Sequence, residues 1–544
     1  MTGPAVQRAA SLAFSVRSQR YRYSLHSFST ASGQTHSPTL WHLIAEAQGS
    51  SDQNVAEATQ SITASIRSLR NHSSVSFLSL YDGSLPGDSV LQAVVRKSEK
   101  AALEATGKLS PGAAVNLTGR FQRSKGQMQQ LEFLVEYGAV IAECDTASHP
   151  LLSSSKVPRA SLLRQHAHLR SQLPVFAATI RLRCRLENAM AEWFDQQEFI
   201  RTQPPIITST DCEGAGEVFR VSDTKDSEEH AAQAYLTVSA QLHLEALLLG
   251  LGRVYSFIPT FRAEESATNR HLREFWMCEA ELPVEAAESE DQQLEEIMHV
   301  VEQLIRHAAR TALGMMGTGP RQEAAFRDVE FLHSSQEPMQ GSLQELYKYF
   351  GHAEPSWQRI SYSRAIEILQ ERYDEGHWDE GQTARPQWGD SISSEQEKYL
   401  CTERFSSPLF VTDYPAALKP FYMRVASEPL IQNFQGKTVK CFDLLVPGIG
   451  ELVGGSLRED RAEVLQRRMA ELRLNKSTKM EKIDIGPGVK SHALQWYTSS
   501  LRRSGMPCHG GFGVGVERLV MWIAKQDSVR DCIPFPRVGR HIKF

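Results

Sequence analysis

Alternating apolar and polar residues dominate the first third of the chain. From about Gln60 to Cys144, short runs such as SVSFLSLYDGS and LQAVVRK are separated by turn residues. Alternation with a period of two is typical of half-buried strands. About five such runs in this segment predict a small closed β-barrel.

A helical pattern replaces this alternation from about Val175 to Phe199. In ATIRLRCRLENAMAEWFDQQEF the apolar residues recur every three or four positions, which predicts a long amphipathic helix. The helix is expected to end in IRTQPPIITSTD, where two prolines favour extended backbone. The remainder of the chain mixes strand and helix patterns, and Ser394 and Glu397 have the spacing of a helix capping box.

The N-terminus has a distinct composition. The first acidic residue is Glu46, and four arginines precede it among many serines and alanines: Arg8, Arg17, Arg20 and Arg22. A segment rich in Arg and Ser and free of acids is typical of a mitochondrial transit peptide. We therefore expect residues 1–40 to be an unstructured transit peptide and the protein to act in the mitochondrial matrix. A tail without a targeting role is the alternative.

Charge and cysteine content limit the kinds of partner. The 544 residues carry a net charge of −5, with 41% apolar and 23% charged residues, as in an ordinary globular protein. Because the chain is not a polycation, any nucleic-acid binding has to use local basic surfaces. The eight cysteines form no CxxC pair or zinc-like cluster, which predicts reduced thiols. No apolar run is long enough to span a membrane.

The stretch PTFRAEESATNRHLREFWMCEAEL, residues 259–282, predicts a hairpin with unusual chemistry. Strands near 254–264 and 274–282 place six side chains on one face: Arg262, Glu264, Phe275, Met277, Glu279 and Glu281. The other face is expected to be buried and carries Trp276, Cys278, Ala280 and Leu282. A solvated face with cross-strand ion pairs is one interpretation. The other is a pocket for a nucleotide and an amine, because arginine clamps phosphate, an aromatic ring stacks on a purine and carboxylates accept N–H groups.

A glycine-rich segment supports the pocket. GGFGVGVERLVMWIA, residues 510–524, reads as a strand running into a helix, with Arg518 just inside the helix. Glycines let a ligand approach the backbone closely. Neither a dinucleotide-binding GxGxxG in a βαβ unit nor a GxxxxGK[ST] phosphate loop is present.

These strings resemble the motifs of a known family. FRAEESATNRHLREFW resembles motif 2 of the class II aminoacyl-tRNA synthetases, GFGVGVER resembles motif 3, and FIRTQPPIIT resembles motif 1. The likeness continues through LTVSAQLHLE, VTDYPAALKPFYMR and FDLLVPGIGELVGGSLRE over roughly residues 60–544. It is specifically with the asparaginyl-tRNA synthetases, of a mitochondrial and fungal type.

The resemblance implies an α+β fold with two domains. An N-terminal OB-fold barrel that binds the anticodon is expected at 41–148, followed by a hinge at 149–174. A class II catalytic domain is expected at 175–544, with a mixed, mainly antiparallel sheet of six to seven strands flanked by helices. Motif 1 is placed at about 190–210, motif 2 at 254–282 and motif 3 at 510–524. A homodimer through motif 1 is also implied.

The resemblance implies an ATP site around motifs 2 and 3. Arg262 would contact the α-phosphate, Glu264 would accept from the adenine amino group, and Phe275 would stack on the ring. Arg518 would cover the other adenine face and reach the γ-phosphate. The resemblance also implies that Arg270, His271 and Leu272 contact ATP. Asp443 and Glu451 are the implied ligands of Mg²⁺, and Glu451 is in addition an implied ATP contact. Arg262 and Arg518 are the implied catalytic residues, and they would act through positioning and charge rather than proton transfer.

The implied amino-acid site comprises Glu213, Gln241, Glu279, Arg458 and His509. Glu213 and Gln241 would hold the α-amino group, whereas Arg458 and Glu279 would hold a side-chain amide. An aspartate would set a carboxylate against Glu279. The aspartyl relatives carry a lysine where this chain has Leu244, so the resemblance favours L-asparagine. A mitochondrial aspartyl-tRNA synthetase is the alternative.

In the barrel, Phe77 and Gln92 match the pair that reads the middle anticodon base. Stacking on an aromatic ring is worth about 1–3 kcal/mol. A core Phe with a surface Gln is the alternative interpretation. The implied reaction forms asparaginyl-adenylate and pyrophosphate from asparagine and ATP, and then charges the 3′ end of tRNA(Asn). A catalytically inactive RNA-binding relative is disfavoured, because the motif residues are retained.

Overall fold

The computed structural model of the chain describes residues 38–539, apart from several internal segments. Those segments are residues 50–57, 125, 127–128, 153–158, 210–217, 223–233, 265–267, 286–288, 336–342, 352–355, 378–383, 428–435, 472–482, 485–489 and 492–493. The predicted transit peptide, except for 38–40, lies outside the described residues, and so does Glu213. Among the helices of the described part, none combines the length and the hydropathy that a membrane span requires.

The N-terminal domain is a closed five-stranded barrel, as predicted. Its strands are β1 Gln60–Asn71, β2 Val75–Tyr81, β3 Leu91–Arg96, β4 Ala114–Arg123 and β5 Leu131–Ala142, joined in the order β1-β2-β3-β5-β4. Alternate residues point inward, so that Leu78 and Leu80 are fully buried while Phe77 is half-buried on the outside. Helix α1 Leu40–Gly49 packs Leu40 and Leu43 into the same core. Helix α2 Lys97–Glu104 follows β3.

The connector leads into the predicted long helix. Helix α3 Ala160–Gln165 and a 3₁₀ turn, Arg170–Gln172, precede α4 Pro174–Gln196. Pro174 suits the first turn of α4, because the missing N–H has no partner there. The helix ends before Phe199, since Glu198 adopts a left-handed φ of 61°.

The catalytic domain is built on a mixed sheet, and its main strands are antiparallel. Within the described residues the order is β12-β13-β14-β15-β18-β11-β10-β6. The bounds are β6 Ile200–Arg201, β10 Val254–Phe261, β11 Glu274–Pro283, β12 Gln358–Ser361, β13 Leu409–Thr412, β14 Cys441–Val446, β15 Gly450–Leu457 and β18 His509–Gly515. The β10–β6 and β12–β13 pairs at the two edges are parallel, and these edge strands extend the expected six or seven strands to eight.

The other described elements surround this sheet. The helices are α5 Gln241–Leu251, α6 Glu290–Ala312, α7 Pro320–Ser334, α8 Leu343–Phe350, α9 Tyr362–Asp374, α10 Ser394–Lys398, α11 Ala462–Glu471 and α13 Val516–Ala524. Short helical turns occur at Tyr399–Arg404, Ala416–Leu418, Trp496–Ser500, Leu501–Arg503 and Val529–Asp531. Two small sheets contain β7 Ile207–Thr208, β9 Ala234–Leu236 and β8 Arg220–Val221, and β16 Ile483–Asp484 with β17 Lys490–Ser491. The latter pair lies between segments that are outside the described residues, 472–482, 485–489 and 492–493.

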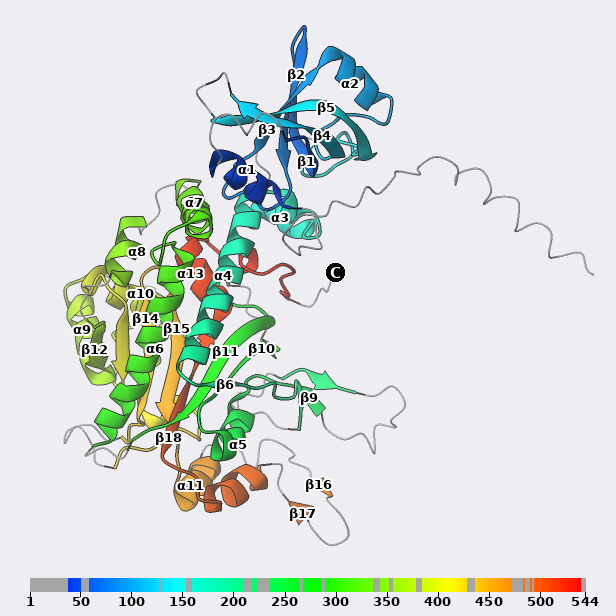
Figure 1. Cartoon of the computed structure of the whole chain (residues 1–544). Helices are drawn as coiled ribbons and strands as arrows, with labels where there is room; N and C mark the ends of the chain where they lie inside the picture. Colours follow the sequence, from blue (N-terminus) through cyan, green and yellow to red (C-terminus); the bar gives the residue numbers. More distant parts are fainter. Residues whose placement is uncertain are drawn as a thin grey trace, which may run out of the picture.

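Helices α4, α6 and α13 cover one face of the sheet (Figure 1). Cys278, Ala280 and Leu282 of β11 are buried in the core that these helices form, as predicted. The prediction that Trp276 is buried with them is wrong, because its side chain is 36% exposed. Its backbone N–H still donates to Glu517 of α13 at 3.0 Å, so this helix contacts Trp276 while the indole stays outside the core.

The predicted capping box is displaced by one residue. Ser393, rather than Ser394, is the N-cap of α10, and its partner is Gln396 rather than Glu397. The Ser393 hydroxyl accepts from the Gln396 N–H at 3.3 Å, and Gln396 Oε1 accepts from the Ser393 N–H at 2.8 Å. The capping interaction therefore leaves Ser394 and Glu397 available for other contacts.

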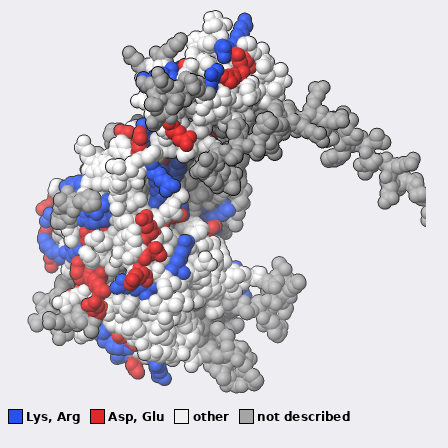
Figure 2. Space-filling model, viewed as in Figure 1, with Lys and Arg blue, Asp and Glu red and all other residues white. Residues whose placement is uncertain are grey.

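A buried carboxylate joins the barrel to the catalytic domain. Asp328 of α7 accepts from the Gly87 N–H in the barrel at 2.7 Å and from Arg181 of α4 at 2.7 Å. Arg181 also donates to the Gly83 carbonyl at 3.0 Å. The barrel is thereby held at one end of the catalytic domain (Figure 1). On the face shown in Figure 2, acidic and basic residues are interspersed, in keeping with the absence of a global positive charge.

Candidate active site

A cavity of about 350 Å³ opens on the sheet face opposite α4 and α6. Residues from β11, β14, β15, β18, α5 and α13 line it, together with Arg262 and Glu264 just after β10 and residues of the segment 418–423. Twelve of the predicted site residues meet there: Gln241, Arg262, Glu264, Arg270, His271, Leu272, Phe275, Glu279, Asp443, Glu451, Arg458 and Arg518. The hairpin face predicted from residues 254–282 is therefore a pocket wall rather than a solvated surface.

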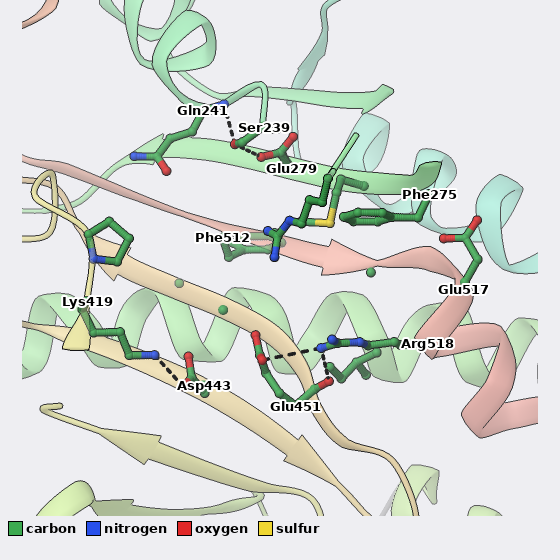
Figure 3. Close-up of a pocket in the computed structure, with 18 of the residues that line it drawn as sticks. Ser239, Gln241, Phe275, Glu279, Lys419, Asp443, Glu451, Phe512, Glu517 and Arg518 are labelled. Carbon is green, nitrogen blue, oxygen red and sulfur yellow. Dashed lines mark hydrogen bonds and ion pairs between the residues drawn. The ribbon is translucent and has the colours of Figure 1, made fainter. Parts of the chain in front are cut away.

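Three arginines converge at what we term the cationic end of the cavity: Arg262, Arg270 and Arg518. Arg518 donates to the Glu451 carbonyl at 2.8 Å and lies 3.5 Å from its carboxylate (Figure 3). Burial lowers the pKa of His271, and the charges of Arg518, Arg270 and Arg262 lower it further. His271 is therefore neutral at pH 7, and the arginines supply the positive charge that a polyphosphate requires.

The aromatic face predicted for a purine lies next to this end. The Arg262 guanidinium is 5.5 Å from the centre of the Phe275 ring. Glu264 and Leu272 line the same part of the cavity, and Leu272 is buried. A ring, an arginine and a carboxylate in one place can stack on a base and accept from its amino group.

Two carboxylates beside the cationic end fit a divalent cation. A Cβ atom placed on Gly454 would lie 3.7 Å from Asp443 Oδ1 and 3.7 Å from Glu451 Oε1, so the two groups flank one point. Carboxylate oxygens are the ligands that Mg²⁺ prefers in proteins. Asp443 also accepts from Lys419 Nζ at 2.6 Å (Figure 3). Burial raises the pKa of Asp443 despite Lys419, while the arginines lower the pKa of Glu451 despite burial.

The opposite end of the cavity, which we term the paired end, comprises Ser239, Glu279, Glu281 and Arg458. The Ser239 hydroxyl donates to Glu279 Oε1, and the Ala240 N–H donates to Oε2 at 2.8 Å. Ser239 Oγ in turn accepts from the Gln241 N–H at 3.1 Å (Figure 3). Two donors therefore hold the Glu279 carboxylate in one orientation.

Arg458 is bound to Glu281 at this end. Its Nε lies 3.1 Å from both Glu281 oxygens, its Nη2 lies 2.5 Å from Oε1, and its Nη1 donates to Ser456 Oγ at 2.6 Å. Burial would lower the pKa of Arg458, but the charge and hydrogen bonds of Glu281 raise it above its usual value. Arg458 therefore stays charged while it is 4% exposed.

A second layer of buried charge lies behind Arg458. Glu245 of α5 accepts from Arg502 at 2.5 Å, from the Tyr497 hydroxyl at 2.9 Å and from Gln241 Nε2 at 2.9 Å. The predicted amino-acid contact His509 belongs to this layer, because its Nε2 lies 3.0 Å from Glu245 Oε2. His509 is fully buried and does not line the cavity, so its predicted direct contact with the substrate is wrong. Its ring is turned from the start of β18 toward Glu245 rather than toward the cavity.

Comparisons with known proteins agree with this geometry. The family model for class II tRNA synthetases (D, K and N) matches residues 160–539. The chain is 34% identical to the asparagine–tRNA ligase, chloroplastic/mitochondrial, of Arabidopsis thaliana, over 92% of this chain and 84% of that protein. It is 36% identical to an asparaginyl-tRNA synthetase of Mus musculus, over 87% and 88% of the two chains. The chain belongs to the asparagine–tRNA ligase family.

Solved structures support the same assignment. An asparaginyl-tRNA synthetase from Pyrococcus horikoshii, complexed with asparaginyl-adenylate, superposes with a TM-score of 0.72 and 27% identity. The match covers 94% of this chain and all of that one. An aspartyl-tRNA synthetase from Entamoeba histolytica, at 21% identity and a TM-score of 0.64, shares the fold.

The predicted anticodon pair of this family member lies on the outside of the barrel, on neighbouring strands. In the β2–β3 register Phe77 faces Val94 and Ser79 faces Gln92. Gln92 Oε1 accepts from Arg70 at 3.3 Å, and its Nε2 donates to Glu132 at 3.4 Å. Phe77 is half-buried on the outer face, so the interpretation of a core Phe is wrong.

Glu281 was placed on the pocket face by the strand pattern, but its pairing with Arg458 was not predicted. Sequence reasoning missed three further residues of the site: Ser239, Lys419 and Glu397. Ser239 had a local signal, because it precedes Gln241 in the string SAQL. Glu397 had none, since it meets Arg270 across 127 positions of the chain.

Proposed function

We propose that the chain activates L-asparagine with ATP to asparaginyl-adenylate and transfers the asparaginyl group to the 3′ end of tRNA(Asn) in the mitochondrial matrix. The observation that carries this proposal is a single cavity with three arginines at one end and the paired end, with Glu279 and Arg458, at the other. Such a cavity suits a triphosphate joined to a neutral, amide-bearing amino acid. The relatives similar to this chain are named asparagine–tRNA ligase and asparaginyl-tRNA synthetase, and both names agree with this reaction.

In the first step, a carboxylate oxygen of asparagine attacks the α-phosphorus of ATP and pyrophosphate leaves. Arg262 stabilises the charge that develops on the α-phosphate, while Arg270 and Arg518 hold the outer phosphates. Mg²⁺ held by Asp443 and Glu451 would neutralise part of the phosphate charge. Phe275 and Glu264 hold the adenine. Because all of these residues position the substrates and none transfers a proton, the reaction proceeds mainly through alignment of the two substrates.

In the second step, a hydroxyl of the terminal adenosine of the tRNA attacks the acyl carbon and AMP leaves. Gln241, together with Glu213 outside the described residues, would hold the α-amino group throughout. In the barrel, Phe77 stacks on the middle anticodon base and Gln92 hydrogen-bonds its edge. These roles for the two domains follow from the resemblance and from the positions of the residues.

Selection of asparagine over aspartate is assigned to the paired end. Arg458 donates to the amide oxygen of the substrate, and Glu279 accepts from the amide NH₂. An aspartate would place its carboxylate against Glu279, which is unfavourable because both groups are negative. Leu244 has an uncharged side chain and therefore supplies no compensating charge. It is fully buried in an apolar cluster with Leu248 and Ile258.

A homodimer is proposed through motif 1. Three isoleucines of this segment, Ile200, Ile206 and Ile207, are 44%, 39% and 58% exposed. Exposed apolar side chains gathered in one segment are typical of a protein interface. A monomer in sedimentation at micromolar concentration would contradict this part of the proposal.

The mitochondrial location rests on the composition of residues 1–40 and on the chloroplastic/mitochondrial relative. A fusion of residues 1–40 to a fluorescent reporter is expected to enter mitochondria. A matched fusion in which Arg8, Arg17, Arg20 and Arg22 are replaced by Gln is expected to stay outside. If neither fusion enters mitochondria, the assignment is contradicted.

ATP–pyrophosphate exchange tests the central claim. We expect asparagine to drive exchange and aspartate to fail at the same concentration. Exchange driven by aspartate and not by asparagine would favour the alternative, a mitochondrial aspartyl-tRNA synthetase. Absence of exchange with both amino acids would favour an inactive relative.

A further inference from the structure

One carboxylate of the cavity region has no role in the reaction described above. Glu397 lies on the short helix α10, and its side chain is 15% exposed. One of its oxygens, Oε2, accepts from Arg270 Nη2 at 3.2 Å and from the backbone N–H of Glu451 at 3.2 Å. A single atom therefore connects an arginine of the cationic end with Glu451, whose carboxylate we propose as a metal ligand.

The neighbouring helix residue adds to this contact. Ser394 Oγ accepts a hydrogen bond from Arg270 Nη1, so α10 binds both terminal nitrogens of the guanidinium. Ser394 and Glu397 are spaced by three positions, which places them on the same side of a helix. The helix does not need either side chain for its own start, since Ser393 and Gln396 form the capping box.

The turn before β15 is shaped for the Glu397 carboxylate. Gly450 has a φ of 87°, a conformation that favours glycine. A Cβ atom at this position would lie 2.5 Å from Glu397 Oε2 and 3.0 Å from Arg270 Nη2. Any side chain would push the carboxylate and the guanidinium apart, so glycine is required for both to approach the backbone of β15.

We propose that Glu397, assisted by Ser394, is a positioning residue that holds Arg270 and Glu451 in register for the outer phosphates of ATP and the pyrophosphate that leaves. A fixed partner for the flexible Arg270 side chain removes part of the ordering that ATP binding would otherwise require. Glu397 also pairs with the positive charge of Arg270 before the triphosphate arrives. The proposal rests on the proposed function of the same cavity.

The experiment is steady-state ATP–pyrophosphate exchange with the full chain carrying Glu397→Gln. The assay is run at pH 8, because burial and the neighbouring Glu451 raise the pKa of Glu397 to about 7, and above this pH the carboxyl is mainly charged. The amide keeps the size of the side chain and loses that charge. Loss of a charged hydrogen bond costs about 1.5–3 kcal/mol, so kcat/KM for ATP is expected to fall on the order of tenfold to a hundredfold. The KM for asparagine is expected to stay within about twofold, because the paired end has separate ligands. Ser394→Ala is expected to show the same pattern with a smaller loss.

Glu395→Gln is the matched control. Glu395 lies on the same helix two residues away and is exposed outside the cavity. It is expected to leave both constants unchanged. Unchanged constants for ATP in Glu397→Gln would overturn the proposal, and so would equal losses for ATP and asparagine together with a lowered Tm. If the wild-type chain shows no exchange with asparagine, the proposed function fails instead, and the two failures are distinguishable.

Discussion

At the paired end of the cavity, Arg458 is 4% exposed and is held by Glu281 in two places, whereas at the cationic end the side chain of Glu451 is 41% exposed beside Arg518. Arg458 is thus paired with a fully buried carboxylate, whereas Arg518 is paired with a carboxylate that stays open to the cavity. The paired end has a fixed geometry and keeps one further carboxylate, that of Glu279. The cationic end gathers three arginines within reach of a ligand.

This difference follows from what each end has to bind. A neutral amide gains little from net charge, so specificity has to come from donors and acceptors in fixed positions. A triphosphate carries several negative charges and is attracted by three arginines gathered in one place. Buried pairs make the first end rigid at the cost of desolvation, which is why Glu245, Arg502 and His509 form a second layer behind Arg458.

The largest expected effect is at the cationic end. Arg262→Ala should reduce ATP–pyrophosphate exchange by about 10³-fold, because one donor to developing charge is worth roughly 3–4 kcal/mol. Binding of tRNA(Asn), measured by filter retention, should survive, since the barrel is distant from the cavity. Exchange at the wild-type rate would refute the role of this arginine.

A substitution in the layer behind the paired end should instead reduce the stability of the protein. Glu245→Gln leaves the buried Arg502 without its anionic partner, and the free energy of unfolding should fall by about 3–5 kcal/mol at pH 7. Glu371→Gln is the control, since its exposed carboxylate pairs with Arg364 on the surface and should cost at most about 1 kcal/mol. Urea denaturation at pH 7 measures both. Equal losses in the two variants would mean that the second layer is not a special source of stability.

The same layer predicts a pH dependence. Burial would raise the pKa of Glu245, but the charges of Arg502 and His509 and the hydrogen bond from His509 lower it below its usual value. A carboxylate with a lowered pKa in the folded state stabilises the protein fully above the pKa of an unfolded glutamate, about 4.3. The stability difference between wild type and Glu245→Gln should therefore shrink as the pH falls below about 4. A difference that grows in acid would contradict the sign.

Selectivity should be more sensitive than rate at Glu279. Glu279→Gln removes the negative charge that faces an incoming aspartate, so the ratio of kcat/KM for asparagine to that for aspartate should fall about 10- to 100-fold. Glu274→Gln is the control, because Glu274 lies on the same strand outside the cavity and pairs with Arg537 at 3.7 Å. The measurement is exchange with each amino acid. An unchanged ratio in Glu279→Gln would place the discrimination elsewhere.

The limits of prediction from sequence follow from the range of each interaction. The barrel strands, the β10–β11 hairpin and the helix α4 were predictable, because their periodicity is local. The exposure of the Trp276 side chain was not predictable, since it depends on which parts of β11 other elements cover. The partner of Arg458 is 177 positions away and Glu397 meets Arg270 across 127, so no local pattern reveals either contact. His509 was assigned by motif, but only the packing of α5 shows that Glu245 takes its ring.

The smallest expected effect is in the barrel, where the proposed binding surface is on the outside and differs from both ends of the cavity. Gln92→Ala removes the hydrogen bond that we propose Gln92 makes to a base edge, so the KM for tRNA(Asn) should rise about 2- to 10-fold, with ATP–pyrophosphate exchange unchanged. Gln122→Ala is a matched control, because Gln122 also donates to Glu132, at 2.7 Å, but from β4. If both variants raise the KM equally, the effect passes through Glu132 rather than through a base. A loss confined to exchange without tRNA would contradict the assignment, because a barrel residue would then act on the cavity with no anticodon bound.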